Sequence, residues 1–130
     1  MHKSRLLYIL IVSIFVLIPG GCAQGTPKEY TTPVPPIDIK AGEQFMITLD
    51  SNPTTGYSWE ASFDKNLLDQ VNSDYKQDQS KPGMVGVGGK HTFIFKGLKT
   101  GSTQIKLIYK RPWEQQSADA KTSIFNVTIK

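Results

Sequence analysis

The sequence predicts an all-β protein, a two-sheet sandwich of about seven short strands. Beyond Ile37 the hydrophobic residues recur with a period of two, which places alternate side chains on one face of a strand. Glycine, proline and asparagine divide these segments from one another, and no convincing helical period is longer than residues 64–69. A chain of 130 residues has room for one such domain.

The strands follow from the alternation in chain order. Ile37 and Ile39 indicate a short edge strand, and the later expected strands are centred on residues 45–50, 57–63, 71–75, 91–95, 103–109 and 125–129. The pattern through 71–75 is the weakest of these. An immunoglobulin-like arrangement is the first choice for strands of this number and length. Because the paired cysteines of antibody domains are absent, another Greek-key sandwich or a small barrel stays open.

The N-terminus has the pattern of a signal peptide over residues 1–21. Basic Lys3 and Arg5 precede an apolar run over residues 6–18, and Pro19-Gly20-Gly21 ends that run. A membrane-spanning helix is the competing interpretation, but it needs about 20 apolar residues to cross the hydrocarbon. The run is shorter than that, so the pattern favours a signal peptide.

Cys22 is the only cysteine of the chain and directly follows this segment. Its position resembles the lipobox of prokaryotic lipoproteins, with Pro19 standing where those motifs usually carry Leu. The alternative is a secreted protein with a free thiol, which would be exposed to oxidation and mispairing. We expect Cys22 to be lipidated, to anchor the exported chain to a membrane of the prokaryotic cell envelope, and to leave the domain without a disulfide.

Residues 22–36 contain four Pro and three Thr, with almost nothing to bury, and are interpreted as a tether. Proline-rich chain extends by about 3.1 Å per residue, so this tether would hold a domain roughly 40 Å from its anchor. The predicted organisation is therefore a signal peptide over 1–21, a lipidated cysteine and tether over 22–36, and one domain over 37–130.

The residue types exclude several classes of function. Two of the 15 Lys and Arg residues lie in the leader, and the others are scattered against 11 acidic residues, so nucleic acid is not an expected partner. His91 is the only histidine after processing, too few ligands for zinc, and a packing role is favoured for it. The glycine-rich run at 86–90 lacks the spacing of a phosphate-binding loop. We expect a monomer without enzymatic activity, cofactor or metal.

Three loop segments remain unusual. The first is Asn52-Pro53-Thr54-Thr55-Gly56, stiffened by its proline, and an ordinary hairpin turn is the alternative. The second is the connection over 76–90, whose glycines let another backbone approach closely, unless it is simply a disordered loop. The third is Arg111-Pro112-Trp113; Trp and Arg are enriched at binding hot spots, although the Trp can also fold onto its own core.

Together these segments resemble the motif set of the chagasin family of papain-type cysteine-protease inhibitors. Asn52 to Tyr57 matches the Asn-Pro-Thr-Thr-Gly-Tyr motif, Gly86 to Gly89 matches Gly-x-Gly-Gly, and Arg111 to Trp113 matches Arg-Pro-Trp. Three motifs in the same order on a β domain make coincidence improbable. The resemblance covers about residues 37–130.

The resemblance implies an immunoglobulin-like domain that wedges three neighbouring loops into the active-site cleft of a papain-type cysteine protease, reversibly and in competition with substrate. It places Thr54 and Thr55 nearest the catalytic cysteine, with the second and third segments on the two cleft walls. The protease-binding residues it implies are Asn52, Pro53, Thr54, Thr55, Gly56, Tyr57, Gly86, Val87, Gly88, Gly89, Arg111, Pro112 and Trp113. The competing hypothesis is an envelope lipoprotein whose immunoglobulin-like module binds glycans or another protein through the same loops.

Overall fold

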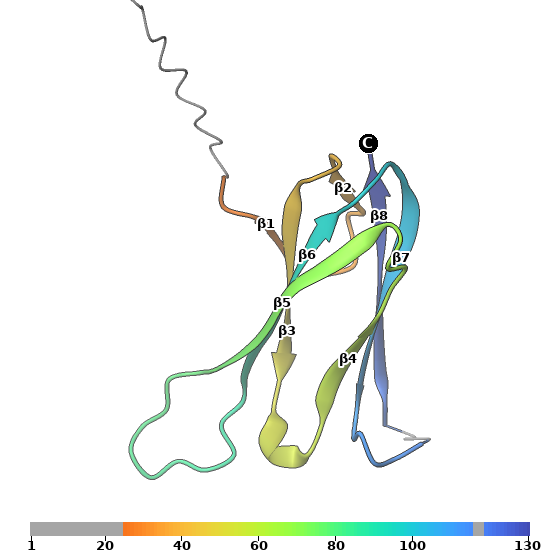
Figure 1. Ribbon diagram of the computed structural model, residues 1–130. Coiled ribbons are helices and arrows are strands. Elements are labelled where there is room, and N and C mark those ends of the chain that lie inside the picture. The colour runs from red at the N-terminus through yellow and green to blue at the C-terminus, as the bar shows by residue number, and fades with distance from the viewer. Residues whose placement is uncertain (1–24, 116–118) are drawn as a thin grey trace, which may run out of the picture.

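The structure, a computed structural model, describes residues 25–115 and 119–130 as two β-sheets packed face to face (Figure 1). The predicted signal peptide and Cys22 lie outside the described residues. The strands are β1 (Lys28–Tyr30), β2 (Ile37–Ile39), β3 (Gln44–Ser51), β4 (Ser58–Ser62), β5 (Leu68–Gln77), β6 (Gly89–Gly97), β7 (Gly101–Lys110) and β8 (Lys121–Ile129). One sheet has the order β1-β3-β6-β5 and the other the order β2-β8-β7-β4. The all-β two-sheet prediction is confirmed.

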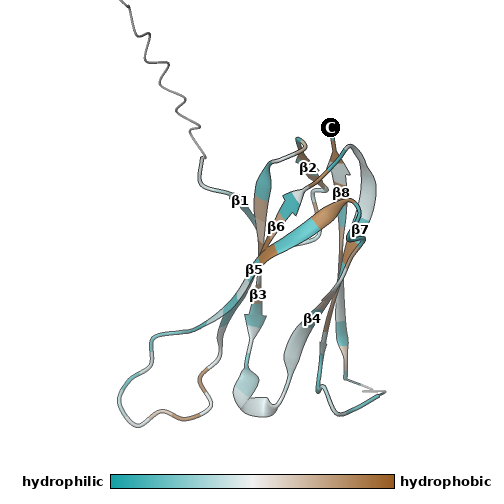
Figure 2. Cartoon of the chain, viewed as in Figure 1, coloured by the Kyte–Doolittle hydropathy of each residue, from teal (hydrophilic) through white to brown (hydrophobic). Residues whose placement is uncertain are grey.

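The alternating hydrophobic residues fill the space between the sheets, as their period predicts. Phe45 of β3 and Phe95 of β6 have no exposed surface and stack with ring centroids 5.7 Å apart, and Phe63 meets Phe95 edge to face at 5.2 Å. From the other sheet, Ile105, Leu107, Phe125 and Val127 complete the core. Figure 2 shows the hydrophobic colouring concentrated on the strands. No helix among the described residues is long and apolar enough to cross a membrane.

His91 serves packing in this fold. Its ring stacks on Phe93 with centroids 4.2 Å apart, and its Nε2 lies 2.8 Å from the hydroxyl of Ser73. Partial burial lowers the pKa of His91 by disfavouring the charged imidazolium, while the carboxylate of Asp74 opposes this effect. The neutral, stacked ring is consistent with the packing role that the sequence favours.

The segment expected to be a free tether contributes to the domain. Residues 28–30 form β1, which pairs in parallel with Phe45 to Ile47 of β3. The Tyr30 side chain is 6% exposed and packs edge to face on Phe45. The expectation that residues 22–36 have almost nothing to bury is therefore wrong for Tyr30, because one aromatic ring anchors this short strand.

The weakest predicted strand is also the most irregular. β5 pairs with β6 along its length, but its register shifts between Gln70 and Asn72, which leaves Val71 as the extra residue of a β-bulge. Val71 is 47% exposed, so this residue does not contribute to the core. An edge strand interrupted by a bulge pairs poorly with other chains.

Gly89 illustrates how closely the strands approach one another. It is the first residue of β6, pairs with Ser51 on one side and Gln77 on the other, and is buried. A Cβ at this position would collide with the main-chain oxygen of Lys76 and approach the Cα of Gln77 to 2.7 Å. At the neighbouring Gly88, a Cβ would come no closer than 3.3 Å, to the oxygen of Ser51.

We therefore predict that Gly89→Ala lowers the free energy of unfolding by about 1–3 kcal/mol, because the backbone must move to admit the methyl group. Gly88→Ala is the matched control and should unfold close to the parent. Urea denaturation followed by tryptophan fluorescence measures both. Equal stabilities for the two variants would contradict the close packing around Gly89.

Candidate protease-binding surface

The three segments singled out from the sequence meet at one end of the sandwich. Loop 1 (52–57) joins β3 to β4, loop 2 (78–88) joins β5 to β6, and loop 3 (111–120) joins β7 to β8. Figure 1 shows these three connections at the lower end of the molecule, away from the C-terminus. Gly89 belongs to β6 rather than to loop 2, so it shapes the base of this surface and not its tip.

Loop 1 is a tight turn held by its own hydrogen bonds. Pro53 to Thr55 form a single 3-10 turn, and Gly56 ends it with φ at 83°, in the left-handed region that favours glycine. The Gly56 amide donates to the oxygen of Pro53 at 2.9 Å, and the Thr55 hydroxyl donates to the oxygen of Asn52 at 2.6 Å. Pro53, Thr54 and Thr55 are exposed at the tip. The loop is thus both stiff and accessible.

Asn52 connects loop 1 to loop 2. Its side-chain amide donates to the main-chain oxygen of Gly86 at 3.1 Å, while its side-chain oxygen accepts from the hydroxyl of Thr54. Gly86 itself has φ at 73°, another left-handed position. The first and second motifs are therefore tied directly together by a side chain of the first.

Loop 2 changes character along its length. It is closed at its base by the amide of Asp78, which donates to the oxygen of Gly88 at 3.0 Å. Figure 2 shows that its first half is hydrophilic and that apolar residues follow. These apolar residues are Met84 and Val85, which are 60% and 94% exposed. The loop presents hydrophobic side chains to solvent immediately before Gly86.

Loop 3 packs against loop 1 through both of its large side chains. The indole of Trp113 lies over Gly56, so closely that a Cβ on Gly56 would be 2.6 Å from the ring. The guanidinium of Arg111 lies 4.7 Å from the ring centre of Tyr57, and its Nε donates to the oxygen of Thr55 at 3.4 Å. Contact with the carboxylate of Glu114, and then with Tyr57, raises the pKa of Arg111, which therefore stays charged.

Trp113 is not a core residue. Its side chain is 69% exposed even though it touches Gly56, which decides between the two sequence interpretations in favour of a surface position. Loop 2 carries two more large exposed hydrophobic residues, Met84 and Val85, so hydrophobic side chains are exposed on both of the loops that flank loop 1 (Figure 1). Large exposed hydrophobic side chains are candidates for contact with a partner.

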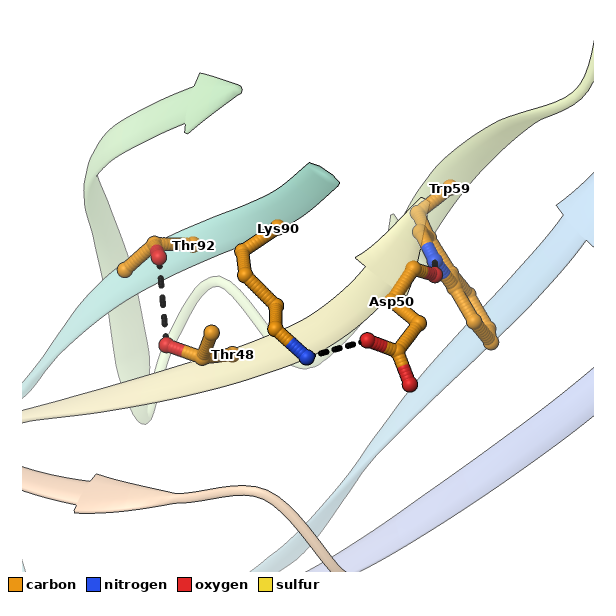
Figure 3. Close-up of polar contacts among 5 residues, drawn as sticks. All are labelled: Thr48, Asp50, Trp59, Lys90 and Thr92. Atoms are coloured by element: carbon orange, nitrogen blue, oxygen red, sulfur yellow. Dashed lines mark hydrogen bonds and ion pairs between the residues drawn. The ribbon is translucent and has the colours of Figure 1, made fainter. Parts of the chain in front are cut away.

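Sequence reasoning missed the aromatic support beneath these loops. Trp59 of β4 lies opposite Tyr109 of β7 in the sheet register, with ring centroids 4.9 Å apart, and Tyr57 stacks on Tyr109 at 5.3 Å. The indole nitrogen of Trp59 donates to the main-chain oxygen of Asp50 at 2.9 Å. Figure 3 shows Trp59 beside Asp50, whose carboxylate pairs with Lys90. The available signal is that Tyr57 and Trp59 fall on the same face of the strand expected over 57–63, but this pattern alone predicts only a half-buried strand.

Comparison with known proteins finds relatives in sequence and in structure. Amoebiasin-1 of Entamoeba histolytica is 42% identical over 83 residues, which cover 64% of this chain and 79% of that protein. The solution structure of Amebosin superimposes with a TM-score of 0.68 at 36% identity, covering 82% of this chain and all of that one. The cysteine protease inhibitor EhICP2 of Entamoeba histolytica gives a TM-score of 0.65 at 27% identity, covering 79% of this chain and 95% of its own.

The family match spans nearly the whole folded part of the chain. Residues 38–129 match the family described as "Chagasin family peptidase inhibitor I42". All three loops and seven of the eight strands, β2 to β8, fall essentially within this range. The members of that family are peptidase inhibitors rather than enzymes. This chain belongs to the chagasin family of peptidase inhibitors.

Proposed function

We propose that this chain inhibits papain-type cysteine proteases reversibly, by inserting loops 1, 2 and 3 together into the active-site cleft in competition with substrate. The observation that carries the proposal is the packing of the three motifs into one surface, with Trp113 seated on Gly56 and Asn52 bonded to Gly86. Family membership supports the same function. A glycan-binding or adhesion module is not favoured, because the relatives are protease inhibitors.

The conformation of loop 1 explains how it would fill a protease cleft without being cut. Cleavage needs a carbonyl free to move to the attacking nucleophile at the correct distance and angle. In loop 1 the oxygens of Asn52, Pro53 and Thr55 each accept a hydrogen bond from within the protein. A tight turn with occupied carbonyls resists the extended geometry that a cleavage site would have to adopt.

The same stiffness would favour affinity. Binding normally costs free energy to immobilise loops and side chains, and a loop that is already ordered avoids much of that cost. Loop 1 is fixed by Pro53, by its internal hydrogen bonds and by the contacts of Arg111 and Trp113. The exposed Met84, Val85 and Trp113 would then supply hydrophobic area on either side of the wedge.

We further propose that Cys22 is lipidated and holds the inhibitor at a membrane of the prokaryotic cell envelope. The sequence around Cys22 motivates this proposal. The position of β1 indicates how an anchored domain would be oriented. β1 runs parallel to β3 with Lys28 opposite Phe45, so the chain enters the domain about 20 Å along β3 from Ser51, where loop 1 begins. An anchor upstream of Lys28 would therefore point the three loops away from the membrane.

The first test is inhibition of papain with a fluorogenic peptide substrate. We expect the apparent inhibition constant to rise with substrate concentration, because loops and substrate would occupy the same cleft, and mass spectrometry after long incubation should find the inhibitor intact. Trypsin serves as the control enzyme and should be unaffected. An unchanged papain rate, or cleavage between Asn52 and Tyr57, would refute the wedge mechanism.

A second test concerns the contribution of Trp113. Trp113→Ala should weaken papain binding by about thirtyfold or more, because a buried interface Trp is typically worth 2 kcal/mol or more. Leu98→Ala is the matched control: Leu98 is 46% exposed in the turn between β6 and β7, remote from the three loops. Both variants should keep the thermal transition of the parent. A folded Trp113→Ala that binds papain as tightly as the parent would show that loop 3 is not an anchor.

A third test concerns Cys22. In a prokaryotic host, Cys22→Ser should abolish both acyl labelling and membrane fractionation, because the acylated thiol is lost. Inhibition of papain by the Cys22→Ser chain should match that of the parent, since the wedge lies at the far end of the domain. If the parent chain itself takes up no label and fractionates as a soluble protein, the lipoprotein hypothesis is wrong.

A further inference from the structure

Tyr109 lies at the centre of the three-loop surface but outside all three motifs. It is the ninth of the ten residues of β7. Its ring stacks on Tyr57 with centroids 5.3 Å apart and lies tilted against Trp59 at 4.9 Å. Alternate residues of neighbouring strands share a face, which brings Tyr57 and Trp59 to the same side as Tyr109 and Arg111. The ring therefore sits in an aromatic stack that Arg111 extends toward loop 3.

The hydroxyl of Tyr109 has a different role from the ring. The main-chain amide of Asn52 donates to it at 2.7 Å, in a partly buried position. Asn52 follows the last residue of β3 and directly precedes the 3-10 turn. Its amide therefore has no strand partner in the sheet. A partly buried amide without a partner costs free energy. This bond holds the first residue of loop 1 against the last residues of β7.

The remaining bonds of Asn52 transmit that constraint. Its side chain donates to Gly86 in loop 2 and accepts from Thr54 at the tip of loop 1, while its main-chain oxygen accepts from Thr55. A displacement of the Asn52 backbone would therefore move the tip of loop 1 and release its bond to loop 2. The hydroxyl of Tyr109 on β7 is a contact from outside the loops that opposes this displacement.

We propose that Tyr109 is a positioning residue of the inhibitory surface, whose hydroxyl holds Asn52 so that loops 1 and 2 keep their binding geometry before any protease arrives. The proposal rests on the proposed function, since the affected property is protease affinity. The stacked ring serves the fold, whereas the hydroxyl serves the loops. The two roles are separable by removing the hydroxyl alone.

The test is Tyr109→Phe in the full chain. Loss of one neutral hydrogen bond should raise the inhibition constant for papain about three- to tenfold. The thermal transition should fall only by what one unpaired amide costs, because the stacking is retained. Hydrogen exchange of the Asn52 amide in the free inhibitor should become faster. The matched control is Tyr30→Phe, which removes the hydroxyl of a buried tyrosine on β1, remote from the loops; its affinity and its Asn52 exchange should equal the parent's.

The outcomes separate this proposal from the proposed function. If Tyr109→Phe binds papain as tightly as the parent, or if its Asn52 amide exchanges at the parent's rate, the positioning role is refuted. If the parent does not inhibit papain at all, the proposed function fails, and the exchange of the Asn52 amide still reports whether the hydroxyl holds loop 1. A loss of affinity equal in Tyr30→Phe and Tyr109→Phe would show a general effect of stability and overturn the proposal.

Discussion

The arrangement of the inhibitory surface depends on the hydrogen bonds of Asn52. This one residue reaches β7 through its amide, loop 2 through its side-chain nitrogen, and the tip of loop 1 through both of its oxygens. No aliphatic or charged side chain of similar size offers a donor and an acceptor at this reach. Asn52 is thus a junction between segments far apart in the sequence, and the turn around Pro53 is shaped by these bonds as much as by the proline.

Gly56 is the second residue on which the surface depends, because it has no side chain. The absence of a Cβ admits both the left-handed φ of 83° and the indole of Trp113 directly above the backbone. Trp113 is consequently supported on one side while 69% of its surface stays exposed. A large side chain held in place before binding loses less entropy on binding. Gly56 of loop 1 therefore helps to order Trp113 of loop 3 before a partner binds.

The sequence predicted the strands well and the contacts between loops hardly at all. Alternation identifies Phe45, Phe93 or Phe125 as core residues because several consecutive positions agree on one face. Tyr30 was missed because β1 has only three residues, one of them buried, and because each residue of β1 pairs with a residue of β3 that lies 17 positions later in the sequence. The three motifs can be recognised in the sequence. The contact of Trp113 with Gly56 and the hydrogen bond from Asn52 to Tyr109 cannot, because they depend on strand register, which no local sequence pattern contains.

The path of the chain explains why loop 1 carries the junction. Loop 2 joins two strands of one sheet, and loop 3 joins two strands of the other, so each is placed by its own hairpin. Loop 1 alone crosses between the sheets at this end, from β3 to β4, over the roughly 10 Å that separates packed sheets. A rigid crossing therefore helps to hold loops 2 and 3 at a fixed spacing. Asn52 fastens one end of the crossing to loop 2, Arg111 and Trp113 fasten the other to loop 3, and the spacing of the core sets the width of the wedge.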